Sequence, residues 1–306
     1  MAAPVVLLSG GTGGAKLARG LADVAGDDLV VVANTGDDIE IHGAHVSPDP
    51  DLIAFWLADR IDERGWGLHG DSFAVMEGLR ELGEEVWFAL GDRDLAIGLR
   101  RARRLAEGAR LTDALSELTR SLGIAASVLP MSDEPVRTRV LTGGRWWPVQ
   151  EWLIRGGAQV GPVEDVDFAG ADAARPTAEV LGALAGARAV ILGPSNPIIS
   201  IGPILALPGM REAIRAAPAP VVAVSPVVGG QVLKGPTCPF MAWAGQPVGA
   251  EGIAALYQGL IDGLVADERP ALGVALLETD TLMDTPEARR RIAGETLRFA
   301  EGLSSG

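Results

Sequence analysis

Cysteine is almost absent from the sequence: Cys238 is the only one, so no disulfide can form within the chain. A chain without disulfides suits a reducing compartment. Long hydrophobic runs are missing as well, because none approaches the ~20 apolar residues that a membrane-spanning helix needs. The first eight residues carry no basic leader and run directly into glycine-rich sequence, unlike a secretory signal. We therefore expect a cytoplasmic protein with no membrane segment.

Positive charge is also scarce, above all from lysine. Lys16 and Lys234 are the only lysines, and the 26 basic residues face 40 acidic ones, which leaves a net charge of −14. A field of this sign repels the phosphate backbone of DNA and RNA. We therefore expect no nucleic-acid partner.

Hydrophobic residues and glycine, by contrast, are plentiful. The 306 residues are 48% hydrophobic and 22% charged, which is typical of folded globular chains and excludes disorder as the main state. The 40 glycines and 20 prolines indicate many tight loops. A chain of this length is expected to form about two domains, or one large α/β domain with an insertion.

The first forty residues repeat a pattern of strand, loop and helix. Val5–Leu8 is a buried-strand run, Ser9–Gly14 is nearly all glycine, and Ala15–Val24 has the apolar spacing of a helix. Leu29–Val32 repeats the strand signal and ends in polar turn residues. Such units are typical of a parallel sheet with helices on both faces. We predict an α/β fold: a three-layer, Rossmann-like, mostly parallel sheet.

The sequence pattern changes in the middle of the chain. Residues 136–141, 145–149 and 163–168 resemble short strands broken by Gly-Gly pairs, which indicates a smaller α+β insertion. The buried-strand pattern returns at residues 189–192 and 221–224. We predict a Rossmann-like core in two parts, residues 1–126 and 176–306, with the α+β insertion at residues 127–175.

Four further segments connect the first units to the insertion. Residues 51–64 and 72–82 have helical spacing, and residues 85–90 resemble a strand. A long helical stretch at residues 95–122 is predicted to form two helices, divided near Gly108.

The glycine-rich loop after the first strand is a candidate phosphate site. Its backbone N–H groups precede a helix, where an anion can approach without meeting a Cβ atom. The loop is no Walker A motif, because Gly14 is followed by Ala15, and no dinucleotide fingerprint, because the third glycine position falls on Lys16. We predict phosphate contacts at Gly10, Gly11, Thr12, Gly13 and Lys16; the alternative is a tight turn that binds no ligand.

Four carboxylates lie within fifteen residues after the second strand. Asp37 and Asp38 follow that strand, while Asp49 and Asp51 alternate with prolines that stiffen the chain. Carboxylate oxygens suit Mg²⁺, which usually takes one or two of them together with substrate phosphate oxygens. We predict metal binding or proton transfer for at least one of the four; the alternative for Asp51 is a helix N-cap.

Two more loops follow predicted strands. Arg93 lies in Gly91–Asp94, after the strand predicted at residues 85–90, and is interpreted either as a fork for a phosphate or as an ion-pair anchor. Its position after a strand favours the site. Ser195 and Asn196 follow the strand at residues 189–192 and should reach the same edge of the sheet.

Taken in order, these motifs resemble the 2-phospho-L-lactate transferases of coenzyme F420 biosynthesis. The likeness covers nearly the whole chain and is carried by seven segments: Ser9–Gly13, Asn34–Asp38, Pro48–Asp51, Gly91–Asp94, Leu129–Asp133, Gly193–Pro197 with Ser200–Ile204, and Ser225–Pro226. Pro50 departs from the family, which more often has an aliphatic residue between the two aspartates.

The resemblance implies a Mg²⁺-dependent transfer reaction. A phosphorylated three-carbon acid, 2-phospholactate or phosphoenolpyruvate, would move from a guanosine-diphosphate-linked donor to the terminal ribityl hydroxyl of the deazaflavin Fo, and GMP would leave. The family also implies a homodimer. Whether the donor arm is lactyl, enolpyruvyl or glyceryl depends on the shape of the pocket, which the sequence does not reveal.

The resemblance also suggests a role for each candidate. The donor's phosphates would contact Gly10, Gly11, Thr12, Gly13, Lys16, Ser195, Asn196 and Ser225. The metal ion would be held by Asp37 and Asp38. The acceptor would be bound by Asn34, Asp49 and Arg93. Asp49 or Asp51 would take the proton of the acceptor hydroxyl, with Arg93 balancing charge on the phosphate.

Two other functions stay open on the sequence alone. One is an NAD(P)-dependent oxidoreductase on a Rossmann sheet, although the missing third glycine counts against it. The other is a nucleotide-sensing protein without catalysis, which the carboxylate loop disfavours. Incubation with Fo, donor and Mg²⁺ would separate the three.

Overall fold

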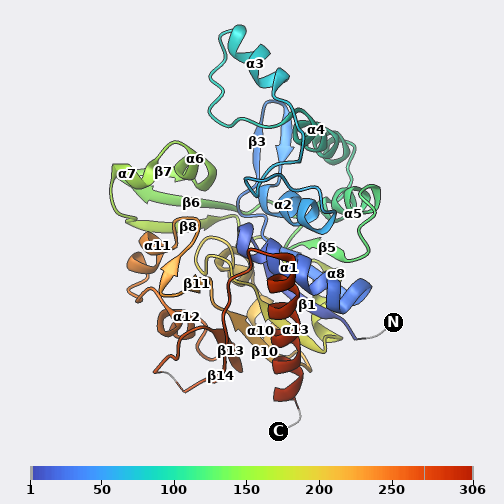
Figure 1. The fold of residues 1–306 in the computed structure, drawn as a ribbon. Helices are drawn as coiled ribbons and strands as arrows, with labels where there is room; N and C mark the ends of the chain where they lie inside the picture. Colours follow the sequence, from blue (N-terminus) through green and yellow to red (C-terminus); the bar gives the residue numbers. More distant parts are fainter. Residues whose placement is uncertain (1–2, 272, 305–306) are drawn as a thin grey trace.

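The computed structural model describes residues 3–271 and 273–304, and these residues form a seven-stranded, fully parallel central sheet (Figure 1). In spatial order its strands are β14 (Ala275–Glu278), β13 (Gly263–Ala266), β10 (Val221–Val224), β9 (Ala189–Leu192), β1 (Val5–Ser9), β2 (Leu29–Ala33) and β5 (Ser127–Pro130). In register, Leu7 of β1 lies between Val31 and Ile191. The predicted α/β, Rossmann-like fold is therefore confirmed.

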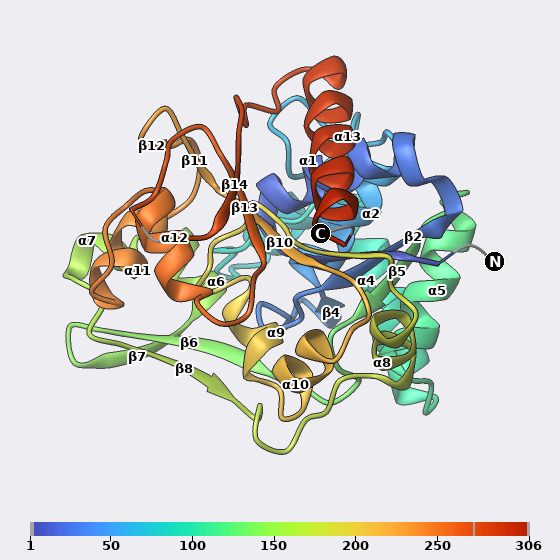
Figure 2. The ribbon, with the colours of Figure 1, turned by 90° about the horizontal axis from the view of Figure 1, so that it is seen from below.

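Helices cover both faces of the sheet, because strands buried on two sides must meet apolar partners on both. One face packs against α1 (Gly11–Ala25), α2 (Pro48–Leu57), α5 (Leu111–Ser121) and α13 (Pro286–Leu303). The other packs against α8 (Ala178–Ala185), α9 (Gly202–Ala206), α10 (Met210–Arg215) and α12 (Ala250–Leu256). Figure 2 shows α1 and α13 on one side of the sheet and α9 and α10 on the other. The molecule thus has the three layers that the sequence predicts.

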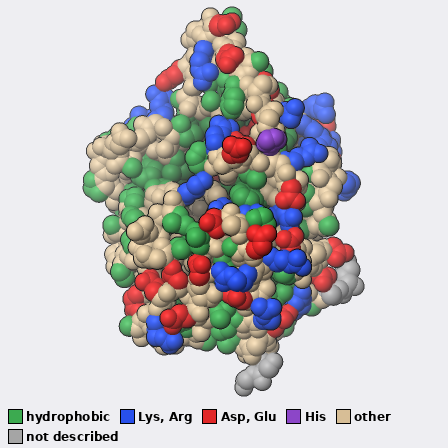
Figure 3. Space-filling model, in the orientation of Figure 1, with side chains coloured by type: hydrophobic (Ala, Val, Ile, Leu, Met, Phe, Trp, Pro, Cys, Tyr) green, Lys and Arg blue, Asp and Glu red, His purple; other side chains and the backbone are tan. Residues whose placement is uncertain are grey.

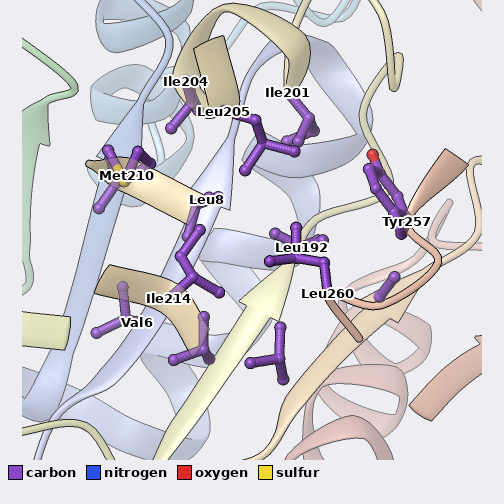
Figure 4. Packing of buried hydrophobic residues seen from close by; sticks show 14 of the residues in the cluster. Val6, Leu8, Leu192, Ile201, Ile204, Leu205, Met210, Ile214, Tyr257 and Leu260 are labelled. Carbon is purple, nitrogen blue, oxygen red and sulfur yellow. The ribbon is translucent and has the colours of Figure 1, made fainter. Parts of the chain in front are cut away.

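The core under the second face is aliphatic and fully buried (Figure 4). Leu8 of β1 and Leu192 of β9 point toward Ile204 and Leu205 of α9, and Ile214 of α10 lies beside them. Each buried aliphatic side chain of this size stabilises the fold by roughly 1.5–3 kcal/mol relative to an exposed one.

The order of the strands reverses between β1 and β9. From β1 the chain proceeds to β2 and β5 toward one edge, and from β9 it proceeds to β10, β13 and β14 toward the other. Loops after two such strands diverge, and ligands of open α/β sheets bind in the crevice that this leaves. The loops that follow β1 and β9 therefore face a common space.

A second, antiparallel sheet lies beside this crevice. It consists of β7 (Arg145–Pro148), β6 (Arg137–Thr142) and β8 (Asp165–Ala169), and it carries α6 (Val149–Ile154) and α7 (Gly157–Val160). Trp152 and Phe240, the latter from α11 (Thr237–Trp243), share its small core. The short strands expected at residues 136–168 are thus present. The predicted boundary at residue 127 falls on β5, a strand of the central sheet, so the separate sheet starts at Arg137.

A lobe projects beyond the sheet at the top of Figure 1. It contains the hairpin of β3 (Ile39–Ile41) and β4 (Ala44–Val46), together with α3 (Ala74–Glu81) and α4 (Asp92–Ala106). Met76, Leu90 and Leu95 form its core with residues of the hairpin. Along the chain, α4 is followed by Gly108, whose φ of +88° ends the helix before α5 begins, as predicted.

Two local predictions are wrong, one in this lobe and one for α2. Residues 85–90 form no strand, because no other strand runs alongside to pair with them; Val86 and Phe88 instead pack on the lobe's core. The helix expected at residues 51–64 begins earlier and ends at Leu57, because Asp59 has a left-handed φ of +52°. The helix expected at residues 72–82 is confirmed as α3.

The remaining elements are short: η1 (Gly26–Asp28) and a hairpin of β11 (Val227–Val228) and β12 (Gln231–Val232). Among the described residues, every helix is too short or too polar to cross a bilayer.

Candidate active site

A cavity of about 750 Å³ opens at the carboxyl ends of the central strands, where the strand order reverses. Most of the residues predicted for the site line it: Gly10, Gly11, Thr12, Gly13, Lys16, Asp37, Asp49, Asp51, Ser195, Asn196 and Ser225. They come from segments as far apart in the chain as those that follow the first and the tenth strand. A volume of this size is typical of sites for small organic ligands.

The N-terminus of α1 forms one wall of the cavity. Gly11 donates its backbone N–H to Asp49 Oδ1 at 2.7 Å, and Gly10 donates to Ser195 Oγ at 3.2 Å. A Cβ atom on Gly10 would overlap the Asp49 carboxylate, and one on Gly13 would overlap the carbonyl of Pro194. The glycines therefore let two loops approach α1 closely, and the helix still directs the N–H groups of its first turn toward the cavity.

Asp37 and Asp49 lie on either side of Asn34. The Asn34 side-chain nitrogen donates to Asp37 Oδ1 at 3.0 Å and to Asp49 Oδ2 at 2.8 Å, and Gln150 donates to Asp37 Oδ2 at 3.2 Å. Burial raises the pKa of Asp49 to about 6, against the opposing effect of its hydrogen bonds. Burial and the charge of Asp49 raise the pKa of Asp37 well above its usual value. The family resemblance implies that Asn34 binds the acceptor. In the structure its side chain donates to both Asp37 and Asp49.

These two acids fit a divalent cation. Carboxylate oxygens are the ligands that Mg²⁺ prefers, and a cation bound at Asp37 would favour its charged form, which burial and the charge of Asp49 disfavour. Within residues 3–271 and 273–304, no three His, Cys, Asp or Glu side chains converge as a metal site. Phosphate oxygens of a substrate and water would have to complete the coordination, as is usual for Mg²⁺.

Asp38, the other predicted metal ligand, lines a second cavity of about 580 Å³. Its Oδ2 accepts from Ser47 Oγ at 2.9 Å and lies 3.0 Å from His45 Nε2. Its Oδ1 is buried and has no hydrogen-bond partner in the part of the chain that the structure describes. The structure therefore separates the carboxylate contacts of Asp38 from those of Asp37.

Asp51 is paired with an arginine that the sequence did not single out. Arg101 of α4 binds both Asp51 oxygens, one of them at 3.0 Å, and also donates to the carbonyl of His45 at 2.9 Å. Both side chains are buried. The pair joins α2 to α4 at the wall of the cavity. Both oxygens of the Asp51 carboxylate are therefore already bound to Arg101.

Arg93 lies outside the main cavity. Its side chain is exposed and lines a separate cavity of about 330 Å³, together with Arg60, Arg100, Arg101 and Arg104. Lys and Arg side chains gather over α4 and α5 on the face shown in Figure 3. The argument that placed Arg93 in the site relied on a strand at residues 85–90, and that strand is absent.

The lobe supplies a wall that the sequence analysis missed. Trp66, Phe73, Trp87 and Phe88 line the main cavity, as does the half-buried Asp94 of α4. Trp87 and Phe88 stack with ring centroids 5.6 Å apart. Aromatic side chains of this kind suit a planar ligand. Their signal in the sequence was weak because they are spread over irregular segments with no helical or strand period.

One of the two lysines joins two segments that line the cavity. Lys234 Nζ donates to the carbonyl of Arg64 at 3.0 Å and lies 5.0 Å from the centre of the Trp66 ring. Lys16 lines the cavity from α1, where burial and the charges of Lys234 and Arg289 lower its pKa.

Comparisons with known proteins give a consistent result. The family model described as 2-phospho-L-lactate transferase CofD matches residues 5–286. The 2-phospho-L-lactate transferase of Methanosarcina mazei is 38% identical over 300 residues, which cover 94% of this chain and 98% of that protein. The phosphoenolpyruvate transferase of Kitasatospora aureofaciens is 39% identical and covers 99% of both chains.

Among solved structures, a UPF0052 family protein from Bacillus halodurans has the same fold. Its TM-score is 0.65 at 17% identity, and the match covers 97% of this chain and 99% of that one.

Proposed function

Since the chain belongs to the 2-phospho-L-lactate transferase family, we propose that it moves a phosphorylated three-carbon acid from a guanosine-diphosphate-linked donor to the terminal ribityl hydroxyl of the deazaflavin Fo, and that GMP leaves. The chain is a transferase by family. Relatives of similar identity are named for phospholactate and for phosphoenolpyruvate, so either donor arm is compatible with the likeness.

One observation carries the proposal: the N-terminus of α1 and the acids Asp37 and Asp49 face the same cavity. The helix terminus attracts the donor's diphosphate, whereas two carboxylates would repel it. A Mg²⁺ ion held by Asp37 would offset the repulsion between the carboxylates and the diphosphate, because it would neutralise charge on the diphosphate oxygens. Thr12, Gly13, Lys16 and Ser195 would supply the remaining donor contacts.

The reaction requires a proton acceptor near the ribityl hydroxyl. We assign Asp49 to this task, because hydrogen bonds from Gly11 and Asn34 hold its carboxylate at the edge of the phosphate site. The hydroxyl oxygen attacks the phosphorus that bears the three-carbon acid, the bond from that phosphorus to the bridging oxygen of GMP breaks, and Asp49 takes the proton. Asp51, neutralised by Arg101, joins α2 to α4.

The planar ring of Fo would lie against the aromatic wall formed by Trp66, Phe73, Trp87 and Phe88. This arrangement gives each substrate its own end of the cavity, with Asp49 between them.

The test is a transfer assay with Fo, Mg²⁺ and lactyl, enolpyruvyl or glyceryl donors side by side, read by the mass of the product. Asp49→Asn should lower kcat by at least ~10², the scale of losing a positioned base. Asp37→Asn should instead raise the Mg²⁺ concentration needed for half-maximal rate. Asp113→Asn, on the surface of α5, is the control. Near-normal turnover in EDTA, or no product from any donor, would contradict the proposal.

A further inference from the structure

The segment Gly91–Asp94 contains two aspartates with different surroundings. Asp92 caps α3: its carboxylate accepts the backbone N–H groups of Ala74 at 3.1 Å and Val75 at 3.0 Å. Asp71 caps α4 in return, by accepting the N–H groups of Arg93 at 2.9 Å and Asp94 at 3.2 Å. Gly91 leaves room for the Asp71 carboxylate. Reciprocal capping thus explains Gly91 and Asp92.

The carboxyl group of Asp94, in contrast, caps no helix. Among the described residues it forms neither a hydrogen bond nor an ion pair, and it lines the main cavity. The charged groups that face it are Asp51 of α2, Arg101 of α4 and Asp71 of the preceding loop. Asp94 is half-buried, and a carboxyl group in such a place is more stable when it has a hydrogen-bond donor, because burial removes part of its hydration. A partner from outside the chain would supply that donor.

The position of Asp94 limits what the partner can be. It belongs to the lobe that carries Phe73, Trp87 and Phe88, whereas the phosphate contacts and Asp49 belong to the β1–α1 side of the cavity. A second negative charge here would repel a phosphate. The partner should therefore be a neutral group that donates a hydrogen bond, on a molecule with a planar, apolar body.

We propose that Asp94 binds the imide N–H on the edge of the acceptor's ring system and so selects the acceptor. The inference rests on the proposed function, since Fo carries such an N–H group. Asp94 accepts the hydrogen bond while the aromatic wall holds the face of the ring. A site that pairs a buried polar group with a substrate N–H rejects an analogue that lacks it, because the group is then left unpaired.

The test compares binding of Fo with binding of an analogue methylated at the imide nitrogen, by titration calorimetry. The wild-type protein should bind Fo at least tenfold more tightly than the analogue. Asp94→Ala should remove the difference, and Asp94→Asn should keep part of it, because an amide oxygen still accepts an N–H bond. Asp113→Asn is a matched control, because Asp113 occupies the same third position of the adjacent helix α5.

Kinetics supply the second readout. Asp94→Ala should raise the acceptor KM and leave the donor KM within about twofold, whereas a general loss of folding would change both. If Asp94→Ala still discriminates against the methylated analogue, or changes only the donor KM, the inference is wrong while the proposed function stands. If the wild-type protein binds no Fo at all, both are wrong.

Discussion

At the scale of single residues, the four central carboxylates of the site have different environments. Asp37 and Asp49 share Asn34, Asp51 is paired with Arg101, and Asp94 has no partner among the described residues. Because its contacts differ at each position, the same type of side chain would serve in our proposals as a cation ligand, a base or a recognition group, and at Asp51 it is a structural anchor.

Asp94 should also affect stability in a pH-dependent way. Burial, and then the charge of Asp51, raise its pKa to about 7, whereas an unfolded chain has an ordinary aspartate. The folded state therefore holds the proton more tightly, and stability falls as pH rises from about 4 to 7. Arg101 opposes the shift and Asp71 adds to it.

Replacing Asp94 removes this destabilisation. Asp94→Asn should raise the free energy of unfolding at pH 8 by on the order of 2 kcal/mol, after a reduction for contact with solvent in the cavity, and by much less at pH 4. Denaturant unfolding at the two pH values measures the difference. Asp113→Asn should show no such trend. An equal effect at both pH values would rule out ionisation of Asp94 as the cause.

At the scale of elements, buried polar contacts hold the helices around the cavity. Asp49 caps α1 from the start of α2, and Arg101 joins α4 to Asp51 of α2. These contacts bring the lobe and the central sheet to one site. They also make the geometry of the site depend on a helix, α4, that contributes Asp94 to the cavity wall.

Breaking the Arg101 pair should be costly. Arg101→Met leaves Asp51 buried without its counter-charge, and loss of one partner of such a pair usually destabilises by about 3–5 kcal/mol. Thermal unfolding should show a large fall in Tm. Arg103→Met, two residues along the same helix and exposed, should change stability by less than about 0.5 kcal/mol. Comparable stability of the two variants would show that the pair contributes little.

At the scale of the whole molecule, the cavity lies between three parts that are distant in the sequence: the central sheet, the antiparallel sheet with α6, and the lobe. Lys234, which follows the β11–β12 hairpin, contacts the loop of Arg64 and Trp66, and all three residues line the cavity. The contact is exposed and consists of one hydrogen bond and one cation–π contact.

Lys234→Ala should remove the contact with Arg64 and Trp66 without unfolding the protein. Loss of an exposed cation–π contact of about 0.5–1 kcal/mol should raise the KM of both substrates by about two- to fivefold, with Tm unchanged. Arg269→Ala, which removes an exposed ion pair with Glu278, is the control for loss of a surface charge. A change in kcat alone would indicate that Lys234 acts on the reaction itself.

The sequence by itself determined the layered fold and much of the phosphate end of the site. Buried strands appear as unbroken apolar runs, and the loops that follow them, such as Gly10–Gly13 and Ser195–Asn196, must reach one edge of a parallel sheet. The apolar runs and the polar loops after them can be read from short stretches of sequence. That ligands bind at the carboxyl ends of parallel strands is a general rule for such sheets. Asp37 could be found in this way because it lies in the loop after β2, and Asp49 because it lies in the first turn of the helix that follows.

Only the tertiary structure decided the position of Arg93 and the surroundings of Asp94 and Arg101. Their placement depends on the direction of α4, which follows an irregular segment whose path is set by packing on Leu90 and Met76 rather than by strand pairing. Arg101 and Asp51 are 50 residues apart in the chain. Because neither residue carries a local signal for the other, the pairing follows from how the lobe packs on the sheet.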